Sequence, residues 1–153
     1  MKSHKHLKFL SATCAMLASA SLLAAPGHGN YEGVEATQVP LLGGNKTILD
    51  QTYAYPTGAP LINSYSVTIS AGKATDIHAH SVPVLAYVVS GQMEVDYGSK
   101  GKRTIRAGES YVEAINWCHQ ARAAGGKPVK ILVSYLGQAD SGGMKSTVCA
   151  KFE

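Results

Sequence analysis

Hydrophobic and polar residues alternate along much of the chain after residue 60. In the clearest run, Tyr65, Val67 and Ile69 alternate with serine and threonine, which is the period of a strand with one buried face. Similar runs rich in valine, isoleucine, tyrosine and threonine recur at short intervals. They predict strands at residues 61–70, 84–90, 92–97, 102–106, 109–115 and 129–136.

Glycine or proline separates most of these runs, and no segment after residue 27 has the length and periodicity of a helix. Many short strands with turn signals between them predict an all-β sandwich or barrel. Residues 28–153 contain no repeat, linker or heptad pattern. We therefore expect them to form a single domain.

The first 27 residues have a different pattern. Residues 1–8 are basic, residues 9–25 are uncharged and rich in leucine and alanine, and Pro26 and Gly27 follow. This layout predicts a cleavable signal peptide over residues 1–27, with small-residue triplets at 18–20 and 25–27 that both suit cleavage. The uncharged run is shorter than the ~20 apolar residues of a membrane-spanning helix, so no stable membrane anchor is expected. We expect an exported protein, periplasmic or secreted.

The net charge argues against several classes of partner. The formal charge is +4, and it falls to +1 once Lys2, Lys5 and Lys8 leave with the leader. A domain so close to neutral has no field that attracts a phosphate backbone. Nucleic acid is therefore not an expected partner.

Two cysteines, Cys118 and Cys149, remain after the leader is removed. Export would place them in an oxidising compartment, where a disulfide between them can persist. Two separate buried thiols are the alternative, because the sequence does not give the distance between them.

Three histidines fall within the predicted domain. His78 and His80 are two residues apart near the start of a predicted strand, so both side chains point to one face, about 6 to 7 Å apart. His119 follows the strand predicted at 109–115 and could supply a third ligand. Three neutral imidazoles suit one divalent transition metal: zinc, iron, nickel, copper or manganese.

The spacing of these histidines from glycines resembles the two motifs of the cupin superfamily. The matching residues are Gly72, His78, His80 and Gly91 in the first motif and Gly108 and His119 in the second. The resemblance covers about residues 60–137, with the motifs inside 72–123. It implies a small double-stranded β-helix, or jelly-roll, barrel that holds a metal inside.

The sequence departs from the cupin pattern at several positions. Val84 stands where the family has a metal-binding glutamate, and Ala114, Asn116 and Ala123 replace the usual proline, glycine and asparagine of the second motif. Glu113 falls where an inward apolar residue is usual, and a carboxylate inside a barrel is costly unless it is paired or bound to a cation. Glu113 is thus a candidate fourth ligand or a catalytic base beside the metal, unless it faces solvent.

Several other side chains near the histidines are candidates for a substrate pocket, with ordinary barrel packing as the alternative. They are Tyr87, Gln92, Tyr111, Trp117 and Arg122. If Arg122 points inward, it could bind a substrate carboxylate through two hydrogen bonds, whereas outward it would be solvated.

No nucleophile elbow, phosphate-binding loop or Cys-x-x-Cys pair occurs after the leader, so any chemistry should depend on the metal. The cupin resemblance favours a metal-dependent enzyme acting on a small organic substrate, oxygenase-like. The alternatives are an isomerase or lyase with a redox-inert metal, and a non-catalytic protein that binds metal or a small molecule. A homodimer is compatible with the resemblance, and residues 34–50 could take part in it.

Overall fold

The computed structural model describes residues 33, 35–139 and 146–152, so the predicted signal peptide lies outside the described residues. The chain divides into two units, residues 1–36 and 37–153, and the second carries the fold and the site. Within the described part of the chain, no helix is long and apolar enough to cross a membrane.

The second unit is built from short strands joined by turns. The strands are β1 (Leu41–Leu42), β2 (Pro60–Ile69), β3 (His78–His80), β4 (Val84–Ser90), β5 (Gln92–Asp96), β6 (Lys102–Arg106), β7 (Ser110–Val112), β8 (Gln120–Ala123), β9 (Val129–Gln138) and β10 (Ser146–Val148). A short 3-10 helix, Gly98–Lys100, joins β5 to β6.

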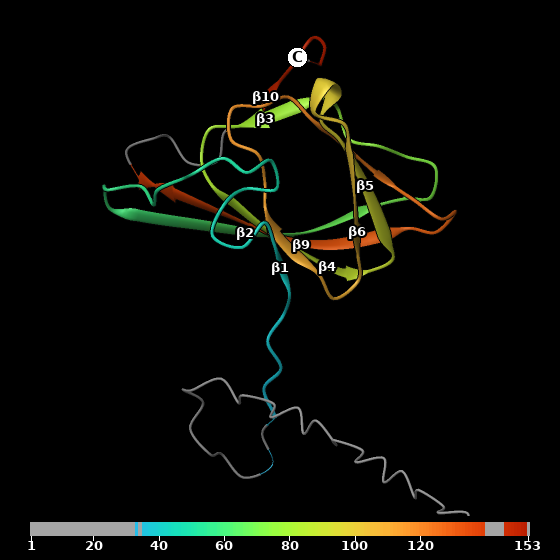
Figure 1. Ribbon diagram of the computed structural model, residues 1–153, viewed down its shortest axis with the longest axis horizontal. Coiled ribbons are helices and arrows are strands. Elements are labelled where there is room, and N and C mark those ends of the chain that lie inside the picture. The colour runs from blue at the N-terminus through green and yellow to red at the C-terminus, as the bar shows by residue number, and fades with distance from the viewer. Residues whose placement is uncertain (1–32, 34, 140–145, 153) are drawn as a thin grey trace, which may run out of the picture. The chain divides into compact units, whose positions relative to one another are not determined.

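The strands form two opposed walls. One wall is a five-stranded sheet in the order β1-β7-β4-β9-β2. The other consists of a three-stranded sheet, β6-β5-β8, and the antiparallel pair β10-β3. Isolated bridges, including one between His78 and His119, connect its two parts. Figure 1 shows β3 and β10 on the side of the ring opposite β4 and β9. This is the predicted jelly-roll barrel.

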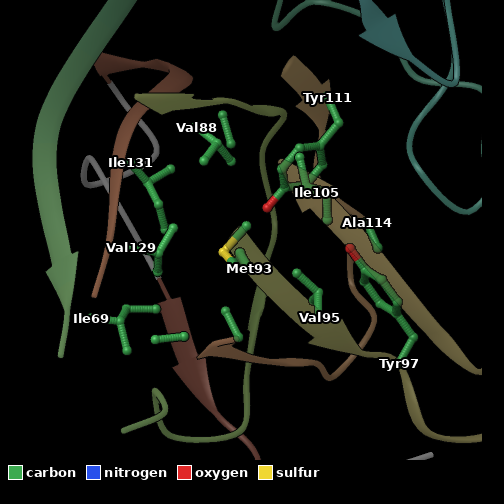
Figure 2. Close-up of a cluster of buried hydrophobic side chains, with 13 residues drawn as sticks. Ile69, Val88, Met93, Val95, Tyr97, Ile105, Tyr111, Ala114, Val129 and Ile131 are labelled. Atoms are coloured by element: carbon green, nitrogen blue, oxygen red, sulfur yellow. The ribbon is translucent and has the colours of Figure 1, made fainter. Parts of the chain in front are cut away.

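The core lies between the walls and follows from the alternation along the strands. Inward-facing residues of β4, β5 and β9 are nearly inaccessible, among them Val88, Val95 and Val129 at 0% exposure. Figure 2 shows Met93, Val129 and Ile131 directed toward one another in this cluster. Burial of these side chains from both walls holds the barrel closed.

Several turns of the barrel have a left-handed backbone, and two of them, at Gly91 and Asn116, bear on the comparison with the cupin pattern. Gly91 joins β4 to β5 at φ +82°, and a Cβ at this position would collide with the carbonyl oxygen of Pro128. Asn116 has φ +51°. Asparagine adopts this region more readily than other residues with a side chain, so Asn116 can replace the usual glycine without changing the backbone.

The sequence pattern located the long strands well and missed the short ones. The expected run at 109–115 contains only the three-residue β7. Strands β1, β8 and β10 were not predicted, because two to four residues give no periodicity to read. Part of the 34–50 segment packs on its own barrel, where β1 pairs in parallel with β7.

A disulfide joins Cys118 to Cys149, which decides between the two alternatives that the sequence left open, and the two Cα atoms are 6.2 Å apart. Cys118 directly precedes His119, and Cys149 directly follows β10. The disulfide therefore fastens the C-terminal strand beside the segment that carries His119.

Candidate metal centre

The structure brings His78, His80 and His119 together. His78 and His80 lie on β3, and an antiparallel bridge places His119 opposite His78. One ligand atom from each histidine lies within 4.8 Å of the others, and the ring centroids are 4.6 to 5.1 Å apart. His80 and His119 are buried, while His78 is half-buried. Side chains that converge in this way can bind a single ion.

The other nitrogen of each ring has a hydrogen-bond partner. His78 Nδ1 donates to the carbonyl oxygen of Asp76 at 2.8 Å, and His119 Nδ1 donates to that of Trp117 at 2.9 Å. A carbonyl can only accept, so these contacts fix the tautomer that leaves Nε2 unprotonated. His80 Nδ1 lies 3.2 Å from the Ser146 hydroxyl on β10. Such bonds orient histidine ligands around a metal, so the donor set fits a divalent transition ion.

The surroundings favour neutral imidazoles. Burial lowers the pKa of His80 to about 3, and the neighbouring His119 and His78 act in the same direction. Burial also lowers the pKa of His78, although its hydrogen bond to the Asp76 carbonyl opposes this. Neutral imidazole is the form that binds metal, so two of the three ligands are already in that form near neutral pH.

Glu113 is buried at 4% exposure and points toward the histidines. Its Oε2 lies 3.5 Å from His119 Nε2 and accepts a hydrogen bond from the Tyr111 hydroxyl at 3.2 Å. Its Oε1 accepts bonds from the Tyr97 hydroxyl and the Ala114 amide, both at 2.7 Å. Three donors compensate for the loss of water around this carboxylate, which explains how the barrel accommodates it.

The two tyrosines are held in the protonated, donating form. Burial raises the pKa of both phenols, and the charge of Glu113 and the hydrogen bond to it raise it further. Tyr97 and Tyr111 therefore remain donors to Glu113 across the neutral range.

Glu113 lies next to Val84 in space, and Val84 holds the position where the cupin pattern has its glutamate. Val84 is 2% exposed and lines the same cavity. The Glu113 amide donates to the Val84 carbonyl at 2.9 Å, so the two residues are paired across adjacent strands. The carboxylate of Glu113, opposite Val84, therefore reaches the histidine group. The loss of glutamate at Val84 thus does not leave the cavity without an acid.

The histidines and Glu113 line a cavity of about 140 Å³ inside the barrel. Tyr111 is the one of the five pocket candidates that lies in its wall. Four other predicted pocket residues lie elsewhere: Tyr87, Gln92, Trp117 and Arg122.

Their positions explain why they do not reach the cavity. Tyr87 alternates with the buried Ala86 and Val88 and so belongs to the opposite face of β4. Trp117 donates from its indole to the Tyr97 carbonyl at 2.9 Å. Arg122 is exposed, and its Nε lies 3.6 Å from Oε1 of Glu94. Gln92 begins β5 as the partner of Arg106.

Sequence reasoning missed three residues that contact the site. Tyr97 donates to Glu113, Ser146 contacts His80, and Tyr135 lies edge-on to His80 with ring centroids 5.3 Å apart. The alternation of Met93, Val95 and Tyr97 could have placed Tyr97 inside the barrel. Nothing near Ser146 in the sequence indicates that it pairs with the histidine strand.

Comparison with known proteins identifies the family. Residues 65–135 match the cupin domain family model, and the barrel and histidine group described above have the features of that fold. Residues 65–135 of the chain form a domain of the cupin superfamily. No curated protein matches it.

Three solved structures to which the chain is similar are distant in sequence. An oxalate decarboxylase from Lactobacillus farciminis is 23% identical, with a TM-score of 0.47 over 57% of this chain and 26% of its own. A DMSP lyase from Ruegeria pomeroyi is 18% identical, with a TM-score of 0.49 over 57% of this chain and 42% of its own. A Neisseria meningitidis protein is 21% identical, with a TM-score of 0.44 over 59% of this chain and 93% of its own. The chain thus spans less than half of the first two.

Proposed function

We propose that residues 28–153 form an exported, metal-dependent enzyme that acts on a small organic substrate, with oxygenase-like chemistry. The observation that carries the proposal is the convergence of three histidines within 4.8 Å, two of them held by carbonyls in the tautomer that frees Nε2. The signal-like leader and the Cys118–Cys149 disulfide support export.

His78, His80 and His119 would hold the metal, with Glu113 as fourth ligand or as a base beside it. When iron, manganese, nickel or copper is bound, the chemistry supplied is activation of dioxygen next to the organic substrate. The apolar wall of the cavity binds the substrate body and excludes water. Tyr97 and Tyr111 fix the Glu113 carboxylate at the polar end.

Glu113 also supports a second candidate, an isomerase or lyase with zinc. Its Oε1 already accepts two hydrogen bonds, whereas Oε2 accepts one and faces the histidines. Oε2 is therefore the atom that could take a proton from a substrate and return it. In this candidate the metal acts as a Lewis acid and needs no dioxygen.

Metal content tests the proposal and separates the candidates. The chain from His28 would be expressed without a histidine tag, purified without chelator and analysed by elemental mass spectrometry beside the His78→Ala/His119→Ala double variant. We expect near-stoichiometric metal that the double variant loses. Iron, manganese, nickel or copper with substrate-dependent oxygen consumption supports the oxygenase, whereas zinc supports the second candidate. If no metal binds even after reconstitution, both are overturned.

The Glu113→Gln variant then assigns the carboxylate, because the amide keeps its size and removes its charge. Loss of metal identifies a ligand, whereas metal retained with turnover lost identifies a base. Unchanged metal content and turnover would show that Glu113 has neither role.

A further inference from the structure

The cavity has two chemically different ends. At one end lie the three histidines, Glu113 and the hydroxyl of Tyr111. The rest of the wall is mainly hydrocarbon and thioether, from residues such as Val67, Met93 and Ile131. Its two hydroxyl groups belong to Thr75 and to Tyr135, which packs against His80. A ligand that fills the cavity must therefore be polar at one end and apolar at the other.

The charge of the polar end limits the charge of the ligand. Among the described residues that line the cavity there is no lysine or arginine, and Glu113 is the only carboxylate. Glu113 offers the one carboxylate in this lining that can offset the charge of a divalent ion, which leaves one positive charge for the ligand to balance. A second negative group on the ligand would find no cation among the other described lining residues, only the hydroxyls of Thr75 and Tyr135, so its loss of water would be costly.

The size of the cavity limits the body of the ligand. Its volume of about 140 Å³ is close to the ~150 Å³ of an engineered apolar cavity that binds benzene. Because the ion and the oxygen-donor end would share this volume, about six carbon atoms is the upper limit for the apolar body. A short dicarboxylate would also fit by volume, so the character of the wall, and not its size, separates the two kinds of ligand.

We propose that the substrate is a compact compound with one oxygen-donor end, at most one negative charge, and an apolar body of about four to six carbon atoms. Small dicarboxylates are poor ligands of this cavity. This inference rests on the proposed function, because the oxygen-donor end is recognised by the metal.

Valerate and succinate test the proposal, since they are similar in size and differ by one carboxylate in place of an apolar end. The chain from His28 would be loaded with cobalt(II), whose visible absorption reports both metal binding and the entry of an oxygen donor. Dissociation constants would then be measured by calorimetry and by the change in absorption. We expect valerate to bind at least tenfold more tightly than succinate.

A charge placed inside the cavity should change this preference. In Val67→Lys the new ammonium group can pair with the second carboxylate, so the valerate preference should shrink or reverse. Leu132→Lys is the matched control, because Leu132 is 45% exposed and adjoins Ile131, which lines the cavity from the same strand. The control should keep the wild-type preference.

The outcomes distinguish failure of the metal centre from failure of the proposed substrate class. If cobalt fails to bind the wild-type chain, the metal centre is wrong and the substrate class falls with it. If cobalt binds and succinate binds as tightly as valerate, the substrate class is overturned while the metal centre stands. The wild-type comparison decides this even if Val67→Lys does not fold.

Discussion

The two walls of the barrel are held together in different ways. In the five-stranded sheet, β2 and β9 pair in antiparallel register along ten residues each, and β9 also pairs with β4. On the opposite wall, the histidine strand β3 has three residues, pairs with β10, and is otherwise joined by isolated bridges. The segment that carries the histidines therefore has far less continuous hydrogen bonding than β2, β4 and β9.

Other interactions compensate on the histidine wall. The disulfide fastens the segment of His119 to the end of β10, and the amide of Cys149 donates to the carbonyl of Ile77 at 2.8 Å. Hydrogen bonds from the rings to Asp76, Trp117 and Ser146 orient the ligands. The five-stranded wall is stabilised by ladders and burial, whereas the site depends on a covalent link and a few specific contacts.

Removing the disulfide should have the largest effect and should act mainly on the histidine wall. Replacing both cysteines, Cys118→Ala/Cys149→Ala, should lower the free energy of unfolding by about 3 to 4 kcal/mol, because the unfolded chain gains freedom. Urea denaturation measures this loss. We also expect hydrogen exchange to accelerate in β3 and β10 before β4 and β9, and metal affinity to fall more than tenfold.

Val88→Ala provides the control from the other wall. Val88 is 0% exposed and does not line the cavity, so its truncation should cost about 2 kcal/mol of stability while metal affinity stays within twofold. The contrast between the walls is wrong if Val88→Ala weakens metal binding as much as loss of the disulfide does.

Acidification should produce a smaller loss of stability in the metal-free protein. The pKa of His80 falls from an ordinary 6.5 to about 3 on folding, so between these values the unfolded chain binds a proton that the folded chain does not. The contribution of His80 to the free energy of unfolding is fully present above pH 6.5. It declines as the pH falls below 6.5 and stops changing near pH 3. Between pH 7.5 and 4.5 we expect a loss of roughly 3 kcal/mol from this residue.

The variant His80→Asn isolates this contribution, because the amide does not titrate. Urea unfolding of both chelator-treated proteins at the two pH values gives the difference. An equal pH dependence in the wild type and the variant would show that His80 is not the residue responsible.

The sequence was sufficient for the parts of the molecule that repeat a pattern. Alternation located β2, β4, β6 and β9, and the His-x-His pair with a third histidine indicated the metal centre. The cupin resemblance placed Glu113 at an inward position with solvent exposure as the alternative, and the structure shows it buried directly after β7. Ring hydrogen bonds to the Asp76 and Trp117 carbonyls could not be predicted, because backbone groups carry no sequence signal.

The contacts that were missed depend on pairings between distant segments. Arg122 and Gln92 are close to the histidines in sequence but lie outside the cavity, because neighbours in a strand alternate between faces. Tyr97 and Ser146 reach the site from 16 residues before Glu113 and 66 residues after His80, respectively. Such pairings depend on the registers of β5 and β10, which follow from tertiary packing.

The smallest expected effect concerns the contact between β10 and the metal centre. Ser146→Ala removes the hydroxyl that lies 3.2 Å from His80 Nδ1, so His80 loses its orienting partner while its Nε2 remains in the site. The loss of one hydrogen bond of this kind should weaken metal binding by about 1 kcal/mol, or roughly fivefold, in competition titrations with a chelator. Thr147→Ala is the matched control: Thr147 pairs with Ala79 and alternates with Ser146, so its hydroxyl faces away from His80 and affinity should not change. If both variants weaken metal binding equally, β10 acts only through its backbone. The proposed orientation of His80 by the Ser146 hydroxyl would then be wrong.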